Sequence, residues 1–232
     1  NSAAKTNYMS GGQMRCPIVF RGPNGAASRV GAQHSQNYGP WYASVPGLIV
    51  IAPYSAADAK GLLKAAIRDD NPVLYIEHKY LYRRIKGAMP AGDHVVPIGK
   101  ARTAREGTDL SIVTYAATVW KALEAAEQLE REDGLSVEVI DLRSLLPMDD
   151  EAIVATVRKT NRVLIVHEDT VTGGIAGEIT ARIQDLAFEW LDAPVKRVAA
   201  HDVPLPYAPA LEDFVLPQTS DIVRAARWLA AY

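Results

Sequence analysis

The chain has 232 residues, of which 48% are hydrophobic and 22% are charged, and its formal net charge is −2. This near-neutral balance, without long blocks of like charge, excludes binding to nucleic acid or to a membrane surface as a main role. Cys16 is the single cysteine, so no disulfide can form within the chain, and no apolar stretch approaches the ~20 residues of a membrane span.

The first ninety residues predict three short buried strands and one regular helix. The strands are apolar runs bounded by turn residues, at Pro17–Phe20, Leu48–Ala52 and Val73–Ile76. Ser55 is an expected N-cap in front of a helix whose apolar positions keep helical spacing to Arg68. So few strands make a poor closed core, and the chain starts without an initiator Met. We therefore expect a fragment whose first domain is incomplete at its N-terminus.

From residue 109 onward, strands alternate regularly with helices of ten or more residues. This alternation indicates βαβ units, a mostly parallel sheet and right-handed crossovers. Because the preceding segment is rich in Gly and Pro, we predict a first domain at 1–90, a linker at 91–108 and a second domain at 109–232. The expected strands are Leu110–Tyr115, Val137–Leu142, Arg162–His167 and Val195–Ala199, and the expected helices are Thr118–Arg131, Met148–Thr160, Gly174–Ala187 and Ser220–Ala231.

The strongest candidate for chemistry is the loop that follows the first strand. Arg21–Gly25 is a dense cluster of turn residues, and it leads to His34. Open α/β sheets bind ligands at the carboxyl ends of their strands, and an imidazole exchanges protons near neutrality. A lone loop histidine is more often structural, and this alternative stays open.

Two further segments have both a functional and a structural interpretation. The helix that ends before Asp69 and Asn71 leaves free carbonyls, and with these side chains it resembles an all-oxygen cation site. An ordinary helix stop is the favoured alternative. His167 and Glu168 end a predicted strand, placed for a ligand or an interface contact or for a hydrogen bond at the edge of the core. Gly173–Glu178 lacks the G-x-G-x-x-G spacing of dinucleotide-binding loops.

Several motifs, taken together, are similar to those of one family. They are MSGG (9–12), PIVFRGPNGA (17–26), QHSQ (33–36), DAKGLLKAAIRDDNPV (58–73), EHKYLY (77–82), PIGKA (97–101), EVIDLRSLLPMD (138–149), VHED (166–169) and DVPLPYAPALE (202–212). From end to end the chain resembles the beta subunits of the thiamine-diphosphate-dependent decarboxylase component of 2-oxo acid dehydrogenase complexes. SAAK and RGPNGA are most similar to the pyruvate members, whereas EHKYLYR is closer to branched-chain 2-oxo acid and acetoin relatives.

The resemblance implies a fold, an activity and a set of partners. The fold would be a transketolase-like pyrimidine-binding domain followed by a transketolase C-terminal α/β domain. The activity would be oxidative decarboxylation of pyruvate with reductive acetylation of a lipoyl group. Thiamine diphosphate and Mg²⁺ would be shared with an alpha subunit in a heterotetramer that contains a second beta subunit. This assembly would bind the dihydrolipoyl acyltransferase core and its lipoyl domain, in a bacterial cytoplasm or the mitochondrial matrix.

The resemblance also assigns roles to particular residues. His34 matches the active-site histidine, which handles protons or orients intermediates during transfer to the lipoyl group. Backbone oxygens of a structural potassium site match Ile18, Ala66, Ile67, Asp69 and Asn71. The cofactor-activating glutamate matches a position before Asn1, so we expect the chain alone to be inactive. The alternatives are a branched-chain or acetoin dehydrogenase beta subunit, a non-catalytic docking fragment for the acyltransferase core and, more distantly, a nicotinamide oxidoreductase.

Overall fold

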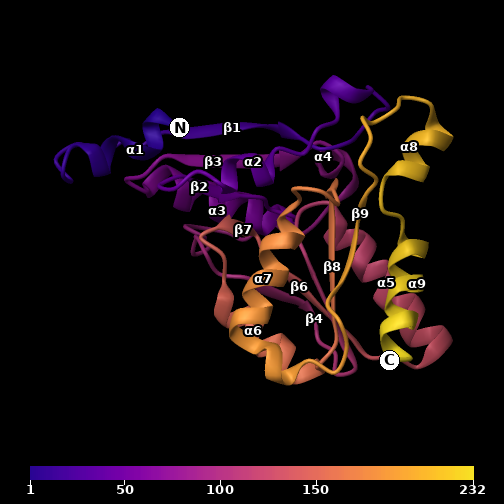
Figure 1. The fold of residues 1–232 in the computed structure, drawn as a ribbon. Coiled ribbons are helices and arrows are strands. Elements are labelled where there is room, and N and C mark those ends of the chain that lie inside the picture. Colours follow the sequence, from indigo (N-terminus) through magenta and orange to yellow (C-terminus); the bar gives the residue numbers. More distant parts are fainter.

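Two β-sheets organise this computed structural model, which describes residues 1–232 (Figure 1). The first sheet has the strand order β1-β3-β2-β7 and the second β4-β6-β5-β8-β9. The strands are β1 (Val19–Asn24), β2 (Ile49–Ile51), β3 (Val73–His78), β4 (Arg102–Arg105), β5 (Leu110–Thr114), β6 (Val137–Asp141), β7 (Ser144–Leu146), β8 (Val163–Thr170) and β9 (Lys196–Ala200). The helices are α1 (Ser2–Met9), α2 (Gly39–Ala43), α3 (Ala56–Arg68), α4 (Leu81–Arg84), α5 (Thr118–Asp133), α6 (Asp150–Thr160), α7 (Ile175–Ala187), α8 (Pro209–Val215) and α9 (Thr219–Ala230), with 3₁₀ turns at Ala32–His34 and Phe188–Trp190.

The first sheet combines three parallel strands with one antiparallel strand from later in the chain. β1 and β2 both pair with β3 in parallel, whereas β7 pairs antiparallel with β2, placing Leu146 opposite Val50. Helix α3 covers one face, where Leu62 and Ala66 join a buried cluster with Tyr75. The Ser55 hydroxyl accepts a hydrogen bond from the N–H of Asp58 at 3.1 Å, which confirms the predicted N-cap.

Strand β1 runs through residues that the sequence pattern assigns to a turn. Gly22, Pro23 and Asn24 continue the parallel pairing with β3, so the expected turn is wrong for residues 21–24. A proline fits here because β1 is the edge strand of its sheet, where a missing N–H need not break a ladder. The chain turns only at Gly25, whose φ is +79°.

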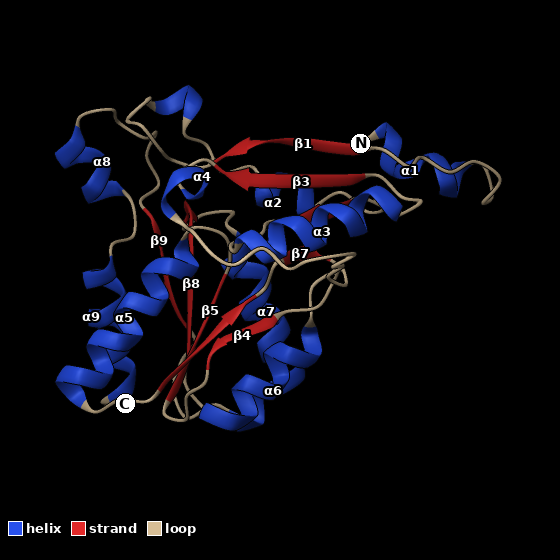
Figure 2. Ribbon diagram, turned by 180° about the vertical axis from the view of Figure 1, so that it is seen from behind, coloured by secondary structure: helices blue, strands red, loops and turns tan.

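The second sheet is the centre of a three-layer α/β/α arrangement (Figure 2). Strands β5, β6, β8 and β9 are parallel, and β4 lies antiparallel on β6. Alternate side chains of the strands pack against α5 and α9 on one face and against α6 and α7 on the other. The predicted alternation is confirmed, but the short elements β4, β7 and α8 were not expected. No helix combines the length and apolar character that crossing a membrane requires.

The two halves of the chain share one buried core. The largest apolar cluster includes Val50 and Ile76 of the first sheet together with Val113, Leu145 and Ile179 from the second half. Both sheets therefore exclude water from the same interface. The predicted domain boundary at 91–108 stays a prediction.

A buried charge network also joins the two halves. Arg143 has a positive φ of 57°, and its side chain donates to Asp58 Oδ1 of α3 at 2.9 Å and to the carbonyls of Lys100 and Ala101, both at 3.0 Å. Burial raises the pKa of the neighbouring Asp141 to about 7, although Arg102 and Arg143 oppose this shift. Because each buried charge has a partner, the network fixes the position of α3 on the second half of the chain.

Candidate functional site

The loop that carries His34 lies between the end of β1 and helix α2. His34 ends the 3₁₀ turn Ala32–His34, and its side chain is exposed. Its carbonyl oxygen accepts a hydrogen bond from the ammonium group of Lys79, which follows β3. The backbone at His34 is therefore held from the first sheet while the imidazole is free to meet a reacting group.

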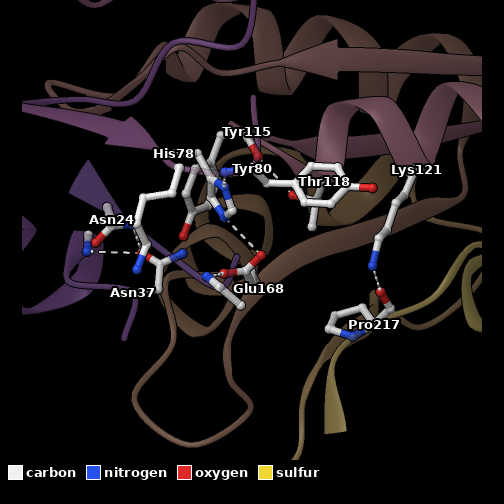
Figure 3. Close-up of polar contacts among 12 residues, drawn as sticks. Asn24, Asn37, His78, Tyr80, Tyr115, Thr118, Lys121, Glu168 and Pro217 are labelled. Atoms are coloured by element: carbon white, nitrogen blue, oxygen red, sulfur yellow. Dashed lines mark hydrogen bonds and ion pairs between the residues drawn. The ribbon is translucent and has the colours of Figure 1, made fainter. Parts of the chain in front are cut away.

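A carboxylate from the second sheet meets a histidine from the first beside this loop (Figure 3). Oε2 of Glu168 in β8 lies 2.8 Å from Nε2 of His78 in β3, and the two atoms form a hydrogen bond. The N–H of Tyr80 donates to Nδ1 of His78 at 3.3 Å, so Nε2 carries the proton and donates to Glu168. The other oxygen of Glu168 accepts the N–H of Ala26 at 2.6 Å. We call this arrangement of Glu168, His78 and the Ala26 N–H the Glu168 clasp.

The charge of Glu168 is stabilised by its partners. Burial alone raises the pKa of this carboxyl group, but His78 and the N–H of Ala26 outweigh burial and hold the pKa below its usual value. Glu168 is therefore ionised at neutral pH.

The two ends of the His34 loop are hydrogen-bonded to each other next to the clasp. Gly25 donates its N–H to the carbonyl of Gln36 at 2.9 Å, and the Asn24 amide donates to the side chain of Asn37 at 3.1 Å. A Cβ on Gly25 would lie 2.1 Å from His78 Nε2, so only glycine fits between the loop and the clasp. The clasp therefore sets where His34 is presented.

A pocket of about 580 Å³ is lined by residues on both sides of His34 in the sequence, although His34 itself is not part of the lining. Its lining comes from the His34 loop, the end of β8 and the segment after β9, and consists of Ala32, Gln33, Ser35, Gln36, Asn37, Tyr38, Trp41, Glu168, Asp169, Thr170, Thr172, Ala200, Asp202, Val203, Pro204 and Leu205. Open α/β sheets bind ligands at such an edge, where parallel strands end. The role of His34 stays a prediction.

The pocket is negatively charged near neutral pH. Hydrogen bonds from the N–H and hydroxyl of Thr172, at 2.9 and 2.7 Å, lower the pKa of Asp202. Burial raises the pKa of Asp169 to about 6, and the adjacent Glu168 adds to this shift. All three carboxylates are mostly ionised at pH 7, so the pocket disfavours an anionic ligand.

The residues predicted to hold a cation lie around the turn between α3 and β3. The carbonyl of Ile18 accepts the N–H of Val73 at 2.8 Å, which brings the start of β1 to this turn. The Asp69 carboxylate accepts the N–H of Asn71 at 2.8 Å, as in an ordinary helix stop. The carbonyls of Ile67, Asp69 and Asn71 accept no hydrogen bond within the chain, so oxygen donors remain. No cluster of three or more His, Cys, Asp or Glu side chains is arranged to hold a metal, and the cation site stays a prediction.

The structure gives His167 and His78 roles that the sequence analysis did not predict. His167 is 1% exposed, neither ring nitrogen has a partner, and burial lowers its pKa to about 4, so it is a neutral core residue. Glu168, beside it, forms hydrogen bonds at the edge of the core, which was one of its alternatives. His78 was not singled out, and only its place at the end of a buried strand could have indicated it.

Comparisons with known proteins define the class of fold. Residues 1–85 match the family model described as the transketolase pyrimidine binding domain, and residues 99–222 match the transketolase C-terminal domain. A solved structure described as "Split gene transketolase, inactive beta4 tetramer" superposes with a TM-score of 0.77 at 24% identity, covering 94% of this chain and 67% of that one. The fold is therefore transketolase-like, as predicted.

Curated relatives define the family more narrowly. The mitochondrial pyruvate dehydrogenase E1 component subunit beta of Saccharomyces cerevisiae is 54% identical over 98% of this chain, and subunit beta-1 of Arabidopsis thaliana is 56% identical over 98%. The subunit beta of Rickettsia felis is 50% identical over 100% of this chain and 71% of its own length. The chain belongs to the family of pyruvate dehydrogenase E1 component beta subunits. It spans 63% of the length of the yeast and Arabidopsis relatives.

Proposed function

We propose that the chain is part of a pyruvate dehydrogenase beta subunit, which acts in oxidative decarboxylation of pyruvate and reductive acetylation of a lipoyl group. Family membership supports this activity, and its main structural support is the exposed His34 imidazole, which is carried by a loop that the Glu168 clasp holds at Ala26. In this role His34 exchanges a proton with the lipoyl sulfur as the acetyl group is transferred, since an imidazole both donates and accepts near neutrality.

The cofactor of the complete assembly would be thiamine diphosphate with Mg²⁺, shared with an alpha subunit. The residues in hand do not fit the activating role, because the glutamate implied by the resemblance matches a position before Asn1, and the carboxylates of Glu168 and Asp202 accept hydrogen bonds from within the chain. We therefore assign the residues of this chain to the acyl-transfer step. A structural K⁺ would bind the free carbonyls at the turn between α3 and β3, whose oxygen donors suit a hard cation.

The proposed partners are an alpha subunit, a second beta subunit, and the dihydrolipoyl acyltransferase core with its lipoyl domain. The similar transketolase structure is described as a tetramer, which supports an assembly of several chains. The compartment would be the mitochondrial matrix or a bacterial cytoplasm, as the names and sources of the relatives indicate.

A branched-chain 2-oxo acid or acetoin dehydrogenase is the second candidate. It is favoured by the segment Glu77–Arg83, which resembles those relatives and lies at the site, since it contains His78 of the clasp. A difference between this segment and that of the pyruvate members therefore lies within the site.

The test uses the complete beta subunit, co-expressed with its alpha subunit and supplied with a lipoyl domain. Mass spectrometry of the lipoyl domain measures acylation with pyruvate, 2-oxoisovalerate or acetoin, and an artificial electron acceptor measures decarboxylation alone. His34→Asn should reduce acetylation at least about 100-fold and leave decarboxylation within a few-fold of wild type. His94→Asn, at a position that does not line the pocket, is the control.

Each outcome of this test selects one function. Acylation only with 2-oxoisovalerate or acetoin would select the second candidate. If no substrate reacts but the acyltransferase core still binds, the chain is a docking component. If His34→Asn behaves as His94→Asn does, His34 has no role in the transfer.

A further inference from the structure

The pocket beside His34 has negative charge but no positive group of its own. Glu168, Asp169 and Asp202 contribute carboxylates to the lining, which contains no Lys, Arg or His. The oxygens of Glu168 and Asp202 accept hydrogen bonds from within the chain. Asp169 forms no ion pair, and no cationic group contributes to its environment. The pocket therefore holds an acidic group that lacks a counter-charge.

A second polar group in the pocket also lacks a partner. Ser35 lines the pocket and is 1% exposed, and its hydroxyl oxygen is buried without a hydrogen bond. A buried hydroxyl without a partner costs free energy, and this one is an acceptor next to His34 in sequence. The pocket thus offers a carboxylate without a counter-charge and a hydroxyl without a hydrogen-bond partner to the same ligand.

An aromatic wall completes the pocket. Tyr38 and Trp41 meet edge to face, with ring centroids 5.5 Å apart at 73°, and both belong to the lining. Trp41 is 66% exposed and Val203, on the opposite segment, is 49% exposed. Exposed tryptophan and apolar side chains around a pocket are typical of a protein interface.

We propose that this pocket binds the guanidinium group of an arginine side chain from a protein partner. A guanidinium group donates in a planar fork to a carboxylate and stacks on an aromatic ring, which matches Asp169, Ser35 and Trp41. No group of three or more His, Cys, Asp or Glu side chains is arranged to hold a metal ion here, and a 2-oxo acid is repelled by the negative charge of the pocket. Only the identity of the partner, the alpha subunit, rests on the proposed function.

Binding of an arginine at this place would have a consequence for the reaction site. Gln33 and Ser35 flank His34 and line the pocket. A partner side chain that bonds Ser35 would hold the His34 loop at a second point, in addition to the hydrogen bond from the Ala26 N–H to Glu168. Binding of the partner would thereby affect the position of the His34 imidazole.

The first experiment titrates the complete beta subunit with two probes and follows amide shifts by NMR. N-acetyl-arginine amide carries the guanidinium, whereas N-acetyl-citrulline amide has the same length without the charge. The arginine probe should shift amides in residues 32–41 and 168–172, and the citrulline probe should bind at least about tenfold more weakly. Equal binding of both probes, or shifts elsewhere only, would overturn the proposal.

Two matched variants separate the pocket from general charge effects. Asp169→Asn should weaken the arginine probe at least about tenfold, whereas Asp185→Asn, an exposed position on α7, should leave it within twofold. Both variants have the same change of charge and volume. Equal effects of the two substitutions would contradict a specific site.

The final measurement distinguishes a protein side chain from a free small molecule. Sedimentation or calorimetry gives the affinity of the beta subunit for its alpha subunit, and Asp169→Asn should lower it at least about tenfold relative to Asp185→Asn. An unchanged affinity would contradict the proposal that the arginine comes from the alpha subunit. Absence of pyruvate turnover in the wild-type assembly would contradict the proposed function without affecting the probe result.

Discussion

Glu168 and His78 belong to different sheets, and their side chains meet through a hydrogen bond of 2.8 Å at the point where both strands end. The second oxygen of Glu168 accepts a hydrogen bond from the N–H of Ala26. One carboxylate of the second sheet therefore links this sheet to the first sheet and to the loop that begins at Gly25. The placement of His34 thus depends on how the two halves of the chain pack, as well as on its own loop.

Substitution of Glu168 should release the loop. Glu168→Ala leaves the N–H of Ala26 and His78 without an acceptor, at a cost of about 1–3 kcal/mol. Hydrogen exchange at the Ala26 amide should accelerate at least about tenfold in the complete subunit. Glu189→Ala, at an exposed position, is the control. Unchanged protection at Ala26 would mean that the clasp does not hold the loop.

Two glycines of one segment should respond differently to the same substitution. Gly25→Ala combines a positive φ with a Cβ 2.1 Å from His78 Nε2, so we expect a loss of about 2 kcal/mol or more. Gly22→Ala has no neighbour within 4 Å of its Cβ and should change stability by less than about 1 kcal/mol. Urea denaturation compares the two, and equal losses would contradict the close approach at Gly25.

The charge network at Arg143 predicts a large effect on stability. Arg143→Met leaves the buried Asp58 without its closest cation and should cost about 3 kcal/mol, whereas Arg131→Met removes an exposed pair and should cost less than about 1 kcal/mol. The double variant Asp58→Leu with Arg143→Met should recover part of the loss. Equal costs for the two single arginine variants in urea denaturation would refute the assignment.

The stability of the subunit should depend on pH through Asp169. Burial raises its pKa to about 6, so the folded state binds this proton more tightly than the unfolded chain does. The free energy of unfolding therefore falls as pH rises from about 4 through 6. Asp169→Asn removes this loss and should be roughly 1 kcal/mol more stable than wild type at pH 8, with little difference near pH 4. Asp185→Asn, measured in the same urea series, should show no such difference.

The sequence predicts what depends on local pattern. The alternation after residue 109 and the Ser55 cap could be predicted, since each depends on neighbours along the chain. The turn expected at Arg21–Asn24 is wrong because pairing with β3 outweighs the turn propensity of Gly and Pro. Pro23 can stay in β1 because β1 is an edge strand, and the position of a strand in its sheet cannot be derived from the local sequence.

Only some residues of the site could be predicted from the sequence. His34 was indicated by its place after a strand and a glycine-rich loop, and Glu168 by the end of another strand. Their connection through His78 joins residues 90 positions apart, and no pattern in the chain encodes that distance. The acidic pocket was also not expected, because its three carboxylates come from two separate segments.

The pairing of β7 with β2 has a consequence for how this protein is made. Residues 144–146 form one edge of a sheet whose other strands all lie before residue 79. A ribosome that synthesises the chain from its N-terminus must add more than sixty residues after β3 before the first sheet can close. During this interval β2 presents an unpaired edge, which is the kind of surface that chaperones shield from other nascent chains.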